Sequence, residues 1–301
     1  MNASTMAEHR TANQEAEARD RYELLRALGS VALTPPPGNE SVWQALDLSP
    51  ATGAEHTEVF VLGLPPHAAI YLGDEGKLGG EGLDRVGGFW RALGLRSPED
   101  ADHLGALLML YAELGLAELL ADNDRSVEQL RMSRQVLLHE HLWPWVPAYL
   151  HAVAGLRVPS LAEWAALTLA AVVEEHEGAT PVPLLPLALR EALRPLAAND
   201  SVDDLLDTLV APVRCGVLLS QRDLQAGAAV VGVGFRRGER RFALRAMLEQ
   251  DAPATLGWLA ERARAWVEVH RGHGSDPTTE WWRARAESTA TVLVAALEGE
   301  R

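Results

Sequence analysis

The residues with the clearest capacity for chemistry form a short acidic run that ends in a histidine. This run, Glu99-Asp-Ala-Asp-His103, comes directly before an apolar segment with helical spacing. Acidic side chains in a first turn stabilise a helix through its dipole, and Asp100 or Asp102 can cap it, so a purely structural role is one interpretation. The other is that Asp102 and His103 form a hydrogen-bonding site, because a carboxylate can hold a guanidinium group through two hydrogen bonds.

A second run combines two histidines with two tryptophans. In His139-Glu-His-Leu-Trp-Pro-Trp-Val-Pro147 the histidines are two residues apart, so on a helix they point in different directions and make poor co-ligands. No third ligand follows nearby, and we therefore expect no metal site. Trp143 and Trp145 flank a proline and are expected to pack where two helices meet.

Basic residues are concentrated in one segment of an otherwise acidic chain. Residues 214–245 contain seven arginines and two acidic residues, whereas residues 1–213 contain 14 basic and 31 acidic residues. The arginines can lie on a solvated helix face or pair with the acidic part of the chain. Alternatively they bind an anion such as a nucleotide phosphate, and the candidate residues for weak GTP binding are Arg236, Arg237, Arg240 and Arg241.

The glycine-rich segments and the cysteine do not match an enzyme motif. The segment Tyr71-Leu-Gly-Asp-Glu-Gly-Lys-Leu-Gly-Gly-Glu-Gly82 lacks the GxxxxGK[ST] pattern, and its acidic residues would repel a phosphate. Gly232-Val-Gly-Phe-Arg-Arg-Gly238 lacks the GxGxxG spacing, no GxSxG motif is present, and Cys215 has no neighbouring histidine in the sequence. None of these segments therefore makes a convincing active site, and we expect no metal or other resident cofactor.

The elements that must position these residues are predicted to be helices. Apolar residues recur at helical spacing along most of the chain, and only 57–64 and 230–235 are ambiguous between helix and strand. We expect an all-α protein with helices near 22–31, 84–95, 103–120, 126–142, 160–176, 202–209, 223–231, 240–250, 254–269 and 277–297. Ser160 is expected to cap the helix at 160–176.

Breaks in this pattern divide the chain into four parts. The segment 180–195 contains four prolines, which is typical of a linker or an extended crossing segment. We predict a flexible N-terminal tail at 1–14, a single helical-bundle core at 15–179, a proline-rich linker at 180–200 and a C-terminal helical extension at 201–301.

Length and charge narrow the function further. The chain has 301 residues and a formal net charge of −15, which argues against a nucleic-acid partner because the phosphates would be repelled. A single cysteine excludes an internal disulfide framework. No segment has the features of a secretory signal or the ~20 apolar residues that span a bilayer. We therefore expect a cytoplasmic protein without stable membrane insertion.

The order of the motifs resembles a known family. A proline-rich loop leads to Tyr71-Leu-Gly-Asp-Glu-Gly76, and the runs Phe89-Trp-Arg-Ala-Leu-Gly-Leu95, Glu99-Asp-Ala-Asp-His-Leu104 and His141-Leu-Trp-Pro-Trp-Val-Pro-Ala-Tyr149 follow. Across residues 20–176 this pattern resembles the TorD/DmsD family of chaperones for molybdenum-containing redox enzymes. The Asp-His turn and the His-Leu-Trp-Pro-Trp run are the most specific parts of the resemblance.

The resemblance implies a non-enzymatic, all-helical cytoplasmic chaperone. Members of the family bind the twin-arginine leader of a molybdopterin-containing oxidoreductase, protect the immature enzyme and hold back its export until the cofactor is loaded. The turn with Glu99, Asp102 and His103 is similar to the family's Glu-x-Pro-x-Asp-His turn, with Ala101 in place of the proline. The residues that match those lining or buttressing the family's peptide groove are Tyr71, Trp90, His141 and Trp145.

Two other functions stay open at this point. One is a helical protein that binds a nucleotide such as GTP, or another small anion, through the arginine-rich segment 214–245. The other is a helical scaffold or adaptor. For the chaperone, the expected partners are the catalytic subunit of the oxidoreductase and its leader, with this chain as a monomer or homodimer. Neither the particular oxidoreductase nor the role of the C-terminal extension follows from the sequence.

Overall fold

The computed structural model describes residues 3–198 and 200–299, and helices are the regular elements within them. The α-helices are α1 (Ala3–Leu33), α2 (Glu40–Ala45), α3 (Gly53–His56), α4 (Ala68–Leu72), α5 (Gly80–Ala92), α6 (Leu104–Leu120), α7 (Asp124–Val136), α8 (Val146–Gly155), α9 (Pro159–Gly178), α10 (Leu187–Glu191), α11 (Val202–Val210), α12 (Pro212–Cys215), α13 (Gln221–Val231), α14 (Arg240–Gln250), α15 (Ala252–Gly272) and α16 (Pro277–Gly299). Two π-helices, η1 (Thr57–Gly63) and η2 (Leu137–Leu142), complete the set. The predicted all-α fold is confirmed.

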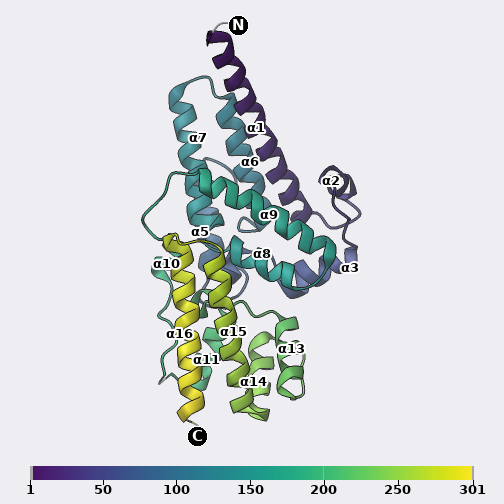
Figure 1. The fold of residues 1–301 in the computed structure, drawn as a ribbon, viewed down its shortest axis with the longest axis vertical. Coiled ribbons are helices and arrows are strands. Elements are labelled where there is room, and N and C mark those ends of the chain that lie inside the picture. The colour runs from purple at the N-terminus through teal and green to yellow at the C-terminus, as the bar shows by residue number, and fades with distance from the viewer. Residues whose placement is uncertain (1–2, 199, 300–301) are drawn as a thin grey trace.

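The N-terminal part of the molecule is a bundle in which the long helix α1 packs along α6 (Figure 1). Gly29 and Gly105 allow this close approach, since a Cβ on Gly29 would lie 2.8 Å from the carbonyl oxygen of Gly105. Buried leucines fill the contact on both sides, among them Leu25, Leu28 and Leu108. Burying one such side chain stabilises the fold by ~1.5–3 kcal/mol, so the apolar face of α1 fixes its place on the bundle.

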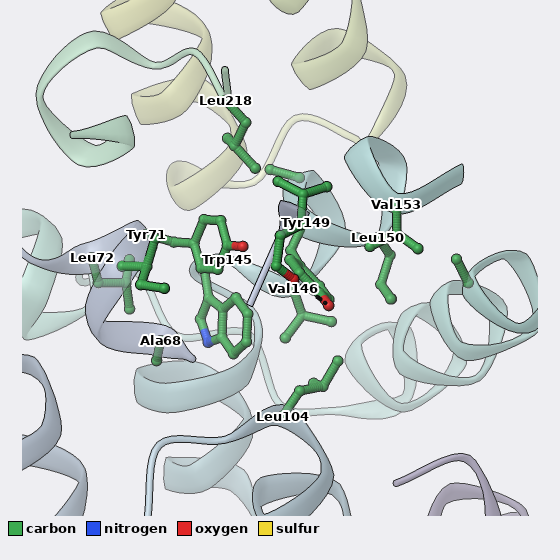
Figure 2. Close-up of a cluster of buried hydrophobic side chains, with 14 of the residues drawn as sticks. Ala68, Tyr71, Leu72, Leu104, Trp145, Val146, Tyr149, Leu150, Val153 and Leu218 are labelled. Atoms are coloured by element: carbon green, nitrogen blue, oxygen red, sulfur yellow. Dashed lines mark hydrogen bonds between the residues drawn. The ribbon is translucent and has the colours of Figure 1, made fainter. Parts of the chain in front are cut away.

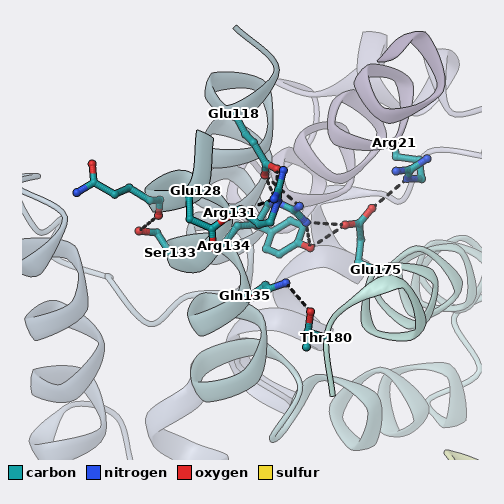
Figure 3. A network of polar contacts seen from close by, with 11 residues as sticks. Arg21, Glu118, Glu128, Arg131, Ser133, Arg134, Gln135, Glu175 and Thr180 are labelled. Carbon is teal, nitrogen blue, oxygen red and sulfur yellow. Dashed lines mark hydrogen bonds and ion pairs between the residues drawn. The ribbon is translucent and has the colours of Figure 1, made fainter. Parts of the chain in front are cut away.

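A polar network at the centre of this bundle joins four helices (Figure 3). The guanidinium of Arg134 donates hydrogen bonds to Tyr111 Oη at 2.7 Å, to Glu118 at 3.1 Å and to Glu175 at 3.2 Å. Tyr111 donates to Glu175 at 2.7 Å, and Arg21 reaches the other oxygen of this carboxylate at 3.1 Å. Burial raises the pKa of the Tyr111 phenol, which therefore stays a donor. Helices α1, α6, α7 and α9 thus share one set of ion pairs.

A buried aromatic cluster lies where α4 and α8 meet the C-terminal part of the chain (Figure 2). The rings of Tyr71 and Trp145 stack with their centroids 5.2 Å apart and their planes 6° apart. Tyr149 packs edge-on against Tyr71 and tilted against Trp145. Leu218 approaches the same cluster from the C-terminal extension, so the apolar core continues from one part of the chain into the other.

The C-terminal extension is a second helical unit, in which α15 packs along α16 (Figure 1). It docks on the core through tryptophans as well as apolar contacts. Trp282 Nε1 donates a hydrogen bond to the carbonyl of Pro144 at 2.6 Å, and Trp143 Nε1 donates to Asp276 at 3.2 Å. The His-Leu-Trp-Pro-Trp run is therefore a docking point for α16.

Cys215, in α12, is fully buried, and burial raises the pKa of its thiol to about 11.

Most helix positions agree with the predicted ones, but several places differ. The helix predicted near 126–142 ends at Val136 and continues as the π-helix η2. Helix α9 begins at Pro159 with Val158 as its N-cap, so the predicted cap at Ser160 is wrong. The ambiguous segment 57–64 forms the π-helix η1. Helix α1 begins at Ala3, so residues 3–14 of the predicted tail are helical here, while residues 1–2 lie outside the described part.

The segment between α9 and α11, predicted as a proline-rich linker, contains the short helix α10. Its contacts tie it to the core: Leu187 N–H donates to Glu140 at 2.7 Å, and Leu193 N–H donates to Asp74 at 3.2 Å. Among the described residues, no helix is long and apolar enough to cross a membrane.

Candidate functional site

The carboxylate of Asp102 fastens the start of α4 to the turn before α6. One oxygen accepts the backbone N–H of Ala69 at 2.9 Å, and the other lies 3.3 Å from Nδ1 of His67. Backbone bonds from Ala68 to Asp102 and from Leu104 to Pro66 align the two segments side by side. The side chain of Asp102 is buried and both of its oxygens have protein partners, so in this structure it positions α4.

His103 caps α6. Its Nδ1 accepts the backbone N–H of Gly105 at 3.0 Å, which corrects the expectation that Asp100 or Asp102 caps this helix. Burial lowers the pKa of His103 to about 4, and the neighbouring His67 lowers it further. A neutral ring matches the cap, because only an unprotonated Nδ1 can accept a hydrogen bond.

The other two residues near this turn have different environments. Trp90, on α5, is half-buried and donates a hydrogen bond from Nε1 to the carbonyl of Ala101 at 3.2 Å. Glu99 is exposed on the outer side of the turn. The turn is therefore held between α4 and α5, with one acidic side chain left facing solvent.

Tyr71, Trp145 and His141 form the aromatic side of the same cluster. Tyr71 donates from Oη to the carbonyl of Pro65 at 2.9 Å, and Trp145 donates from Nε1 to the carbonyl of His141 at 2.8 Å. The His141 ring contacts Phe89 of α5, and burial lowers the pKa of His141 to about 4. The structure thus brings six predicted site residues together around α4 and α5, and most of them are buried. These six are Tyr71, Trp90, Asp102, His103, His141 and Trp145, whereas Glu99 lies apart at the surface.

A cleft of about 790 Å³ opens between the core and the C-terminal extension, next to α4. We call it the junction cleft. Two of its apolar side chains are well exposed, Leu62 at 68% and Leu193 at 49%. Its lining residues come from three parts of the chain. The core contributes Leu62, Ile70, Tyr71 and the loop 74–77, and the segment between α9 and α11, which we call the crossing segment, contributes Leu193. The extension contributes Asp207, Val210, Arg214, Leu218, Leu219, Gln221, Glu239, Arg240 and Arg241.

A second cleft, of about 450 Å³, lies on the other side of the same loop. We call it the glycine-loop cleft, since residues 73–82 form most of its wall together with residues 188–192. Four acidic residues and two basic residues line it, namely Asp74, Glu75, Glu81, Glu191, Lys77 and Arg85. Arg85 pairs with Glu191 at 3.1 Å, and Lys77 lies 3.8 Å from Glu75, where both side chains are largely exposed. Glu81 makes no ion pair with another described residue, so the cleft has an acidic surplus.

The loop between the clefts is fixed to the extension by Arg240. The guanidinium of Arg240 donates to the carbonyl of Gly76 at 3.0 Å and to that of Leu219 at 3.2 Å. Gly76 has a φ of +61°, and a Cβ at this position would collide with the backbone at Val210 and Ala211. Glycine is required here because the loop lies directly on the extension.

The four arginines predicted to bind an anion do not converge in this structure. Arg240 is engaged with two carbonyl groups, and Arg241 pairs with Asp203 at 2.6 Å and with Asp207. Arg236 and Arg237 are exposed in the loop between α13 and α14. Pairing of the basic segment with acidic residues is therefore observed for Arg241, whereas nucleotide binding stays a prediction.

Sequence reasoning missed most of the residues that line the two clefts. The sequence suggests Asp74 and Glu75 both as a reason against phosphate binding and as possible carboxylates for a cationic peptide, whereas Glu81 is not among the predicted site residues and Leu193 lies in a predicted linker. The available signal is the combination of glycines with several acidic residues in a long loop, since such loops in compact domains are usually functional. Of the lining residues in 207–241, only Arg240 and Arg241 are among the predicted binding residues, as part of the basic segment.

The described residues thus form an all-helical protein in which a buried Asp-His and aromatic cluster lies beside two surface clefts, and clefts are where proteins most often bind ligands. The comparison with known families adds an independent observation. Residues 40–150 match the family model described as nitrate reductase delta subunit, a family of NarJ/TorD-type chaperones. Over these residues the chain is similar to this family of molybdoenzyme maturation chaperones, which confirms the predicted resemblance. No curated protein matches the chain.

The matched segment contains the whole supporting cluster and the glycine-rich loop. It ends at residue 150, before the crossing segment and the extension that complete the junction cleft. The family is a chaperone family without a catalytic role. Among the described residues, no group of three or more histidine, cysteine or acidic side chains is arranged to hold a metal ion.

Proposed function

We propose that this protein is a cytoplasmic chaperone that binds the twin-arginine leader, and with it the apo form, of a molybdenum-cofactor oxidoreductase. It assists cofactor insertion and holds back export until the enzyme is mature. The observation that carries the proposal is that the family-matched segment holds an acidic, glycine-rich loop between an acidic cleft and an apolar cleft.

The acidic side chains of this loop suit the two adjacent arginines of such a leader. A guanidinium group binds a carboxylate through two parallel hydrogen bonds, and two neighbouring arginines need acidic groups within one short stretch of surface. Glu75 and Glu81 are exposed at the glycine-loop cleft. They can contact a peptide without any change in the core, whereas Asp102 is already engaged with Ala69.

The buried cluster has a positioning role in this proposal. Asp102 and His103 hold the start of α4, and Tyr71 extends from α4 to the wall of the junction cleft. Trp90 fixes the turn to α5. These residues therefore set the shape of the binding surface, while the loop and the cleft walls make the contacts with the peptide.

The proposal is tested with a fluorescent peptide that contains two adjacent arginines followed by an apolar segment, and anisotropy is measured as the full-length protein is added. The double variant Glu75→Lys/Glu81→Lys is expected to bind about tenfold or more weakly than the wild type, because two attractive charges become repulsive. Replacing the two arginines of the peptide by glutamines is expected to weaken binding to the wild type similarly.

The matched control is Glu163→Lys/Glu177→Lys, which makes the same charge change at exposed positions of α9. This control is expected to bind the peptide within about twofold of the wild type, apart from the general effect of net charge. If the wild-type protein shows no saturable binding of the peptide, or if both double variants weaken it equally, the proposed leader site is wrong.

A further inference from the structure

We infer that the junction cleft binds the apolar segment of the client peptide, so that the C-terminal extension forms one wall of the binding site. This inference rests on the proposed function and assigns the part of the peptide that follows the arginine pair. It gives the extension, which lies outside the family-matched segment, a role in recognition.

The lining of the cleft combines apolar side chains with charged ones. Leu62 comes from η1 of the core, Leu193 from the crossing segment, and Val210 and Leu218 from the extension. Leucines as exposed as Leu62 and Leu193 that line one cleft are typical of a binding surface, whereas isolated exposed leucines are not. The volume of about 790 Å³ lies within the ~300–1,000 Å³ of pockets that take ligands.

An unsatisfied hydrogen-bond donor lies in the same wall. The Nε atom of Arg214 is buried, and it has no acceptor among the described residues. Buried donors in folded proteins are almost always paired, so this one is available to an acceptor on a bound peptide. An extended peptide brings a backbone carbonyl at every residue and can provide that acceptor without carrying a negative charge.

The order of the two clefts fits the order of groups in the proposed ligand. The loop 74–77 lines both of them, so the acidic cleft and the apolar cleft are adjacent along one surface. A peptide in which two arginines are followed directly by apolar residues can therefore place its guanidinium groups near Glu75 and Glu81 and continue into the junction cleft. Because Arg240 bonds to both Gly76 and Leu219, the two walls are held together before a peptide arrives.

The inference is tested by placing a charge on each exposed leucine of the cleft in the full-length protein. Leu62→Asp and Leu193→Asp are each expected to bind the peptide about tenfold more weakly, because a carboxylate is introduced into the apolar contact. A second peptide, which keeps the arginine pair but has serines in place of the apolar residues, is expected to bind the wild type and both variants with equal, weak affinity.

The matched controls are Met132→Asp in α7 and Val230→Asp in α13, since both side chains are exposed large hydrophobic groups outside the clefts. They are expected to bind the first peptide within about twofold of the wild type. Urea unfolding of all four variants separates a loss of binding from a loss of fold. Wild-type affinity in correctly folded Leu62→Asp and Leu193→Asp overturns the inference and leaves the proposed function standing.

Photocrosslinking directly tests whether the extension contacts the bound peptide. A benzophenone group within the apolar segment of the peptide is expected to form adducts with residues 207–221 as well as with the core, and mass spectrometry of the fragments locates them. Adducts confined to residues 1–179 mean that the extension is not part of the site, which overturns the inference. Absence of peptide binding to the wild type overturns the proposed function and this inference with it.

Discussion

At the scale of single residues, Asp102 links the buried cluster to the binding surface. Its carboxylate satisfies the backbone N–H of Ala69, and Ala69 itself lines the glycine-loop cleft. A side chain that never touches a ligand can therefore control affinity by fixing the backbone that does. The same holds for His103, whose ring satisfies the N–H of Gly105 at the start of α6.

We expect Asp102→Ala to lower both the free energy of unfolding and the affinity for the leader peptide. Removing the carboxylate leaves the buried N–H of Ala69 without an acceptor, which costs ~1–3 kcal/mol of stability. Because α4 then loses its anchor, peptide binding should weaken about tenfold. Urea denaturation and peptide anisotropy measure the two effects separately.

Asp102→Asn tests whether Asp102 acts through its hydrogen bond or through its charge. The amide keeps an oxygen that can accept from Ala69, so most of the stability and affinity should return if positioning is the role of Asp102. An Asn variant that binds as weakly as the Ala variant, while remaining as stable as the wild type, would instead show that the negative charge itself contacts the peptide.

The packing of Trp145 at a helix junction was predictable from sequence, but its partners were not. The Asp-His turn is visible in the sequence, Tyr71 and Trp145 are implied by the family resemblance, and the structure brings these residues together. Their spacing did not indicate that the two aromatic rings stack inside the core. That arrangement depends on α4 meeting α8, a contact between segments about seventy residues apart, for which local sequence contains no signal.

At the scale of elements, the Arg134 network decides how the bundle helices are held together. Glu175 of α9 accepts hydrogen bonds from Arg21 of α1, Tyr111 of α6 and Arg134 of α7. Its side chain is only 7% exposed. One buried carboxylate therefore joins three neighbouring helices at once, in addition to the apolar contacts between them.

Glu175→Ala is expected to destabilise the protein by about 3–5 kcal/mol, because it leaves buried partners of a charged network without their acceptor. The adjacent substitution Glu174→Ala provides the control. Glu174 is 64% exposed and lies 3.7 Å from Arg21, so its loss should change the unfolding free energy by less than about 1 kcal/mol. Equal effects of the two substitutions in urea denaturation would contradict the central role of Glu175.

Helical periodicity predicted the elements well where one face is apolar and the other is solvated. Helix α14 occupies 240–250 as expected, and α16 begins at the predicted Pro277. The prediction of a helix start failed where two neighbouring residues each favour the first turn of the same helix. Ser160 was the expected cap of α9, yet Pro159, which suits the first helical position, starts that helix one residue earlier. The π-helix η1 has no distinct periodicity and was ambiguous with a strand.

At the scale of the whole molecule, the buried histidines couple the fold to pH. Burial lowers the pKa values of His103, His141, His270 and His273 to about 4, and two of these residues lie in the core and two in the extension. In the unfolded chain the same side chains have pKa values of ~6.5. Protonation therefore favours the unfolded state between these two values.

We expect the free energy of unfolding to fall as the pH is lowered from about 6.5 to about 4. Above this window both states are neutral, and within it each histidine contributes up to about 1.4 kcal/mol per pH unit. Urea denaturation midpoints measured between about pH 7 and about pH 5 test this, since few carboxylates titrate there. His273→Gln should reduce the proton uptake on unfolding by about one, and a pH-independent midpoint would contradict the prediction.

How the extension meets the core could not be predicted from sequence. The predicted linker and the helices on either side of it were visible, but the junction cleft arises from Leu62, Leu193 and Leu218, which lie in three separate parts of the chain. The net charge of −15 does not indicate where this site lies either, because acidic residues occur throughout the core sequence.

The burial of Cys215 makes the molecule convenient for spectroscopic labelling. Its thiol is the only one in the chain, it is fully covered, and its pKa of about 11 keeps it in the unreactive thiol form at neutral pH. A cysteine introduced at exposed Leu62 or Val230 would therefore be the single site that a maleimide dye modifies, without first deleting a native thiol. Pairs of such sites, one in the core and one in the extension, would report by energy transfer whether the two halves separate when a client peptide enters.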